Sequence, residues 1–173
     1  MNIPATVSNP GDFALQIDRW TDGVKKAAAE AARGLAHEAF ERLLRNSPQY
    51  SGDFAAGWGV GYGALVSNFR EGVFPGHEYG GDLDPFGRAD LPAMEHARAN
   101  VVWQTPKLGT PIFIANDARH EHNYALLIEN DQINWRTPNM GSGHLVTKVV
   151  KSMSRTYSHI TKSQLETLRK AGV

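Results

Sequence analysis

The sequence has no cysteine among its 173 residues, so disulfide bonds and thiolate metal sites are both excluded. It also lacks an excess of either charge, because 18 Lys and Arg balance 18 Asp and Glu. A general nucleic-acid coat needs surplus cations to displace counterions from phosphates, and this balance argues against one, although it leaves room for a local basic patch. No apolar run approaches the roughly 18 residues of a membrane span, and Met1–Pro4 lacks the features of a secretory signal. We therefore expect a soluble protein, made in a cytoplasm, with no membrane partner.

A hydrophobic content of 41% and a charged content of 21% are ordinary for a globular protein, and the length suits one domain with a single core. Residues 1–12 contain Pro4, Pro10 and Gly11, which predict a flexible N-terminal arm. We expect the domain to span residues 13–160 and a C-terminal tail to span residues 161–173.

The first half of the domain is predicted to hold one long helix. Alternation of apolar residues from Phe13 to Ile17 predicts a short strand before it, and Asp18 is the expected N-cap. The helix should run over residues 19–45 and stop before Pro48, which cannot continue the hydrogen-bond ladder. Its apolar stripe consists of Val24, Ala28, Ala31, Leu35, Ala39 and Leu43.

Shorter elements follow. Large residues alternating with glycines from Gly57 to Gly63 predict a strand, and residues 67–88 a long loop that is either functional or disordered. A helix at 93–102, opened by Asp90 and Pro92, precedes a buried strand at 112–115. The remaining expected elements are a helix at 122–129, a turn at 138–143, a helical stripe of Leu145, Val149, Met153 and Tyr157, and a short tail helix capped at Ser163–Glu166. This order predicts an α+β fold, with a small antiparallel sheet packed against a long N-terminal helix and shorter C-terminal helices.

No catalytic signature is present. The run His120-Glu121-His122, with His144 and His159 elsewhere, is the strongest candidate for a metal site. A zinc enzyme needs three placed ligands and a base, and no His-Glu-x-x-His spacing exists, so we interpret the run as a solvated turn. The glycines of the 57–63 strand lack the partners of a phosphate loop, and no Gly-x-Ser-x-Gly elbow occurs. We therefore predict no catalytic residue, metal or cofactor.

The last third of the chain is rich in cations. They are Lys148, Lys151, Arg155, Lys162, Arg169 and Lys170. A solvated helix face is the favoured interpretation, and a patch that touches DNA in a channel or an acidic partner is the alternative.

Four segments in order resemble motifs of tailed-bacteriophage tail-completion, minor tail and neck proteins. Ser47–Phe54 and the following Trp58 are similar to that family's Ser/Thr-Pro-Val-Asp-Thr-Gly-Arg-Leu turn and its tryptophan. Lys107–Asn116 is similar to its strand ending in Asn, Tyr124–Asn130 to its Tyr-Ala-x-x-x-Glu-x-Gly, and Thr137–Met140 to its Ala-Pro-x-Gly-Met turn. The resemblance spans about residues 13–157. The departures are Gln49-Tyr50 in place of Val-Asp, Asp131 in place of Gly, and the additional loop at 67–88.

The resemblance implies a non-enzymatic virion protein, synthesised in a bacterial host, that forms a homo-oligomeric ring, commonly a hexamer. The ring would join portal or connector to tail, or end the tail tube, and DNA would pass through its channel. The candidate fold or interface residues are Pro48, Gly52, Trp58, Asn116, Tyr124, Glu129 and Pro138. Loop 67–88 would dock on a neighbouring ring or line the channel. Two alternatives are a small metal-dependent hydrolase or nuclease that uses His120 and His122, and a monomeric binding module with the same fold.

Overall fold

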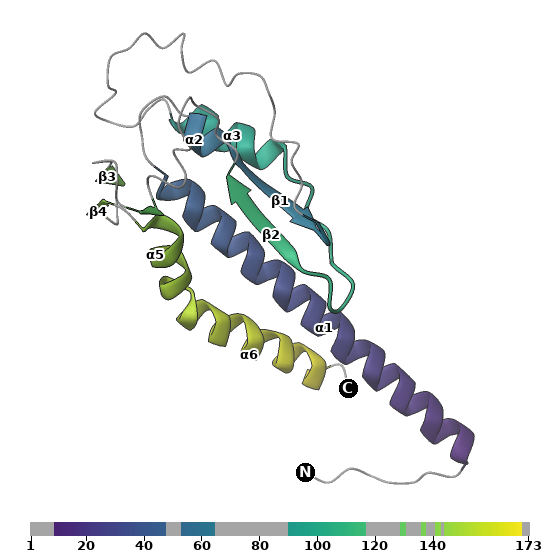
Figure 1. The fold of residues 1–173 in the computed structure, drawn as a ribbon. Helices are drawn as coiled ribbons and strands as arrows, with labels where there is room; N and C mark the ends of the chain where they lie inside the picture. Colours follow the sequence, from purple (N-terminus) through teal and green to yellow (C-terminus); the bar gives the residue numbers. More distant parts are fainter. Residues whose placement is uncertain are drawn as a thin grey trace.

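The computed structural model describes residues 9–47, 53–64, 90–116, 129–130, 136–137, 141–142 and 144–170 (Figure 1). Its elements are α1 (Pro10–Arg45), α2 (Asp53–Ala56), β1 (Trp58–Tyr62), α3 (Asp90–Ala99), β2 (Ile112–Asn116), β3 (Arg136–Thr137), β4 (Gly141–Ser142), α5 (Leu145–Ser152) and α6 (Ser154–Lys170). The predicted α+β class is confirmed: a two-stranded antiparallel sheet packs against a long N-terminal helix and shorter C-terminal helices.

Helix α1 begins nine residues earlier than predicted. Asn9 caps it, because its side-chain oxygen accepts a hydrogen bond from the Gly11 amide at 3.0 Å, and Pro10 occupies the first turn. The predicted strand at Phe13–Ile17 and the predicted cap at Asp18 are therefore wrong, and the expected arm cannot extend to residue 12. The Asn-Pro start makes the segment helical, and the apolar alternation then places its members on two sides of the helix. The predicted end at Arg45 is confirmed.

Strands β1 and β2 pair antiparallel, with Trp58 opposite Asn116 and Tyr62 opposite Ile112. The sheet runs along one flank of α1, and α5 and α6 run along another (Figure 1). All five residues of β2 are only half-buried, so the prediction of a buried strand is wrong: none of the described elements fills the open space beside β2. Helix α3 ends at Ala99, three residues before the predicted end.

The core lies around the C-terminal half of α1. It consists of Phe40, Leu43, Leu44, Trp58, Ala97, Leu145 and Val149, all of them buried. The ring of Trp103 meets Phe40 edge-on, with 5.7 Å between the ring centroids. Helix α1, the sheet, α3 and α5 thus share one core.

Helix α5 ends at Ser152 with Met153 as its C-cap, and α6 runs without interruption from Ser154 to Lys170. The prediction of a separate tail that begins at residue 161, with a helix cap at Ser163, is therefore wrong for the described residues up to Lys170. Thr161 and Thr167 donate hydrogen bonds to carbonyls four residues earlier, which lets these hydroxyls remain inside a continuous helix. Arg42 of α1 holds the α5–α6 corner by hydrogen bonds to the Ser152 carbonyl and hydroxyl, both 2.8 Å, and to the Thr156 hydroxyl at 2.6 Å.

Loop 67–88 lies outside the described residues. So do most of the predicted helix at 122–129 and most of the turn at 138–143. Within the described part, no helix is long and apolar enough to cross a membrane.

Trp58 should be the most sensitive tryptophan of the core. Its indole N–H donates to the Ser47 hydroxyl at 2.8 Å, and that buried hydroxyl donates to the Leu43 carbonyl. Trp58→Phe leaves the hydroxyl without its donor and removes ring volume, so we expect a loss of about 1–3 kcal/mol in unfolding free energy. Chemical denaturation of dilute protein measures it. Trp20→Phe, at a half-exposed position, is the matched control and should change stability by under about 0.5 kcal/mol. Equal losses would contradict the assignment.

The Glu41–Arg98 pair should make the unfolding free energy depend on pH in the acidic range. Arg98 donates to both carboxylate oxygens of Glu41, at 2.8 and 2.7 Å, and these hydrogen bonds hold the pKa of the Glu41 carboxyl below its ordinary value. The unfolded chain therefore takes up the proton first, so the contribution is present above the ordinary pKa of 4.5 and is lost as pH falls through the lower folded value. Glu41→Gln should flatten the fall in denaturation midpoint below about pH 5. The exposed control Glu166→Gln should retain it, and an unchanged acid profile in Glu41→Gln would count against the pair.

Candidate functional site

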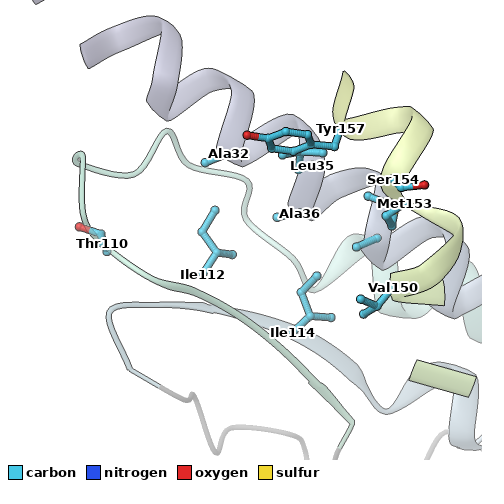
Figure 2. A pocket seen from close by; sticks show the side chains of 11 residues that line it. Ala32, Leu35, Ala36, Thr110, Ile112, Ile114, Val150, Met153, Ser154 and Tyr157 are labelled. Carbon is cyan, nitrogen blue, oxygen red and sulfur yellow. The ribbon is translucent and has the colours of Figure 1, made fainter. Parts of the chain in front are cut away.

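An open apolar groove of about 560 Å³ lies between α1, β2 and the α5–α6 corner (Figure 2). Its lining residues are Ala32, Leu35, Ala36 and Ala39 of α1, Thr110, Ile112 and Ile114 in and before β2, and Val150, Met153, Ser154 and Tyr157 of the corner. We call this surface the groove. Alanines form much of its α1 side, so a neighbouring backbone can approach α1 closely there.

The walls of the groove remain open to solvent. Val150 is 64% exposed and Tyr157 is 57% exposed, and both lie beside the groove in Figure 2. Among the lining side chains only Thr110, Ser154 and Tyr157 carry a polar group, each a hydroxyl. A surface of this composition can bury an apolar partner.

A second uncovered apolar surface lies at the other end of α1. Phe13, Ile17 and Trp20 are 49%, 46% and 50% exposed. Their spacing of four and three residues places them on one side of the helix. We call them the N-terminal stripe. Helix α1 extends past the end of α6 and past the sheet, so neither element covers this stripe (Figure 1).

Charge is divided between the start of α1 and the segment that forms α5 and α6. Residues 10–23 carry Asp12, Asp18 and Asp22 against Arg19, which gives a net charge of −2. Residues 144–170 carry six Lys and Arg against Glu166, which gives a net charge of +5 with histidine neutral. Of the six cations, all but the half-buried Lys148 are exposed. Their exposure agrees with the favoured interpretation of a solvated helix face, and it leaves the surface accessible to an acidic partner.

Three of the predicted site residues are described, and each has a structural role. Trp58 is buried in the core. The Asn116 side-chain amide donates to the Phe54 carbonyl at 2.7 Å and so ties the end of β2 to α2. The Glu129 carboxylate accepts from the Val146 amide at 2.8 Å and from the Thr147 amide and hydroxyl at 3.1 and 2.6 Å, so it caps the start of α5.

The remaining predicted site residues lie outside the described residues. They are Pro48, Gly52, Tyr124 and Pro138, together with the metal candidates His120 and His122. His144 and His159 are both exposed. In the part of the chain that the structure describes, no three His, Asp or Glu side chains are grouped so as to hold a metal ion.

Sequence reasoning missed both the N-terminal stripe and the groove. The stripe had a signal, because the spacing of Phe13, Ile17 and Trp20 is helical. The groove had none, because its walls come from three segments distant in sequence, at residues 32–39, 110–114 and 150–157, that meet only in the fold.

Comparisons with protein-family models, with curated proteins and with solved structures found no match for this chain.

The capping of α5 gives a test of Glu129. Glu129→Ala leaves the first amides of α5 without an acceptor, so we expect a loss of about 0.5–2 kcal/mol in unfolding free energy. Glu129→Gln keeps one acceptor oxygen and should lose less. Thermal or denaturant unfolding measures both, with the exposed Glu166→Ala as the control. If Glu129 served only an interface between subunits, the isolated chain would keep its full stability in Glu129→Ala.

Proposed function

We propose that this protein is a structural, non-enzymatic subunit of a homo-oligomeric ring, commonly six-membered, at the head–tail junction or the top of the tail tube of a tailed bacteriophage. The ring would join portal or connector to tail and leave an axial channel through which DNA passes. The resemblance of four ordered motifs supports the phage assignment. The observation that supports a ring is the presence of two separate uncovered apolar surfaces, the N-terminal stripe and the groove.

Two different surfaces on one chain are what a head-to-tail assembly requires. Each subunit then offers one surface to the neighbour ahead and another to the neighbour behind, and the assembly closes when the rotation between subunits divides a full turn. An isologous dimer could also cover both surfaces if each stripe entered the groove of the other subunit, so the number of subunits in the assembly distinguishes a ring from a dimer. The stripe and the groove lie at different places on α1, which fits the first arrangement.

The lining of the groove supports a mechanical rather than a catalytic role. It holds apolar side chains and three hydroxyls, without a carboxylate, an imidazole or an amine. The Tyr157 phenol is the titratable group of the lining, and no carboxylate, imidazole or amine among the lining residues can act with it. The functional unit that we propose is therefore the contact surface itself.

The test is to delete the gene for this chain from the phage that encodes it and to examine the particles by electron cryomicroscopy. We expect parental virions to show the chain as a closed ring between portal and tail tube. The deletion should leave heads and tails unjoined, or tails of abnormal length, and a copy of the gene supplied in the host should restore joining.

Two results would overturn the proposal. Normal virions after deletion would show that the chain is not needed for joining. Intact parental virions without any copy of the chain would remove the structural role. Metal analysis and a nuclease screen with His122→Ala would then test the hydrolase, and sedimentation the monomeric binding module.

A further inference from the structure

We propose that the N-terminal stripe of one subunit inserts into the groove of the next subunit and that this contact closes the ring. The inference rests on the proposed ring function, and it names the interface and its occupant, which is a second copy of this chain. Phe13, Ile17 and Trp20 would supply the inserted side chains.

The stripe cannot reach the groove of its own chain. Both lie on α1, which is one continuous helix of 36 residues. Phe13 and Ala32 are separated by about 28 Å along that helix at 1.5 Å per residue. A rigid helix cannot fold back on itself, so only another copy can bring the stripe to the groove.

The two surfaces match in length. From Phe13 to Trp20, and from Ala32 to Ala39, the helix advances seven residues, about 10 Å in each case. Helices pack with their axes about 8–10 Å apart when small residues lie at the contact. Ala32, Ala36 and Ala39 supply such residues in the groove.

The polar groups of the two surfaces also match. The Trp20 indole carries one N–H donor, which requires an acceptor when the ring becomes buried. The groove offers the hydroxyl oxygens of Thr110, Ser154 and Tyr157 around apolar walls. An indole inserted there can therefore bury its ring and still donate a hydrogen bond.

Charge favours packing of the stripe against the groove of another subunit over packing against that subunit's stripe. The segment that carries the stripe has a net charge of −2, whereas residues 144–170, of which Val150, Met153, Ser154 and Tyr157 line the groove, carry +5. Two stripes packed against each other would instead bring two acidic segments together, which is unfavourable.

The absence of cysteine makes a direct test possible. A chain carrying Ile17→Cys and Ala36→Cys has one thiol in the middle of the stripe and one on the floor of the groove. Oxidation should link successive subunits into a ladder of covalent oligomers, because a disulfide forms only where the two Cα atoms come within about 7 Å. The matched control is Leu15→Cys with Ala36→Cys, since Leu15 is 56% exposed on the opposite side of the same helix. We expect no ladder from the control.

The experiment is done on concentrated purified protein and on phage particles that carry the variants. A ladder from the Ile17 pair in particles that contain the chain, with none from the Leu15 pair, supports the interface. Three results overturn it: no ladder in particles that contain the chain, equal ladders from both pairs, or dimers formed by Ile17→Cys alone, which indicate stripe-to-stripe pairing. Particles that contain the chain but give no ladder refute the interface and leave the proposed function intact. A ladder in solution with no chain in virions refutes the function instead.

Trp20→Ala gives an independent measurement without cross-linking. Trp20 is 50% exposed in the single chain, so its removal should leave the denaturation midpoint of dilute protein unchanged. It should weaken self-association in sedimentation at least tenfold, because buried tryptophans often dominate interfaces. Val102→Ala, which removes a side chain 71% exposed away from both surfaces, is the control. Unchanged association in Trp20→Ala would overturn the proposal.

Discussion

The packing of α5 and β1 against the C-terminal half of α1 is the interaction on which the rest of the structure depends. Phe40 and Leu44 of α1 are buried together with Trp58, Leu145 and Val149 at this one end. Helix α1 has 36 residues and is therefore about 54 Å long. A strand of five residues or a helix of 17 covers only about 17–26 Å of it. The first turns of α1 therefore extend beyond every described partner, which leaves the N-terminal stripe exposed.

The groove follows from the bend between α5 and α6. Leu145 and Val149 draw α5 into the core, and Arg42 fixes the corner at Ser152 and Thr156. Helix α6 then lies along α1, where Ile160 packs over Gly34: a Cβ at Gly34 would lie 3.7 Å from that side chain, an ordinary van der Waals contact. Because α6 follows α1 rather than the sheet, the space beside β2 stays open. The groove thus forms because α5 and α6 both pack against α1 and leave the neighbouring side of β2 uncovered.

Local signals decided which parts of the fold were predictable. The run from Asn46 to Pro48 ends α1 where expected, and the alternation of glycines with large residues from Gly57 to Gly63 identifies β1. Two errors arose where local patterns had two solutions, at Phe13–Ile17 and at Ser163. The groove and the partner of Asn116 were beyond prediction, because they depend on segments distant in sequence: the Phe54 carbonyl lies 62 residues from Asn116. Trp58 could be anticipated as a fold-making residue, whereas its hydrogen bond to Ser47 could not.

The net charge of zero conceals an uneven distribution of charge along the chain, and this distribution bears on the proposed ring. The net charge of zero is the sum of −2 in residues 10–23, +5 in residues 144–170 and −3 in the rest of the chain. A chain that is acidic at one end of its contact surface and basic at the other prefers neighbours in one orientation, and salt should weaken that preference. In the ring, the acidic segment of one subunit would neutralise part of the basic surface of the next. The same contact would then reduce the attraction between that surface and DNA, which a channel must let pass without holding it.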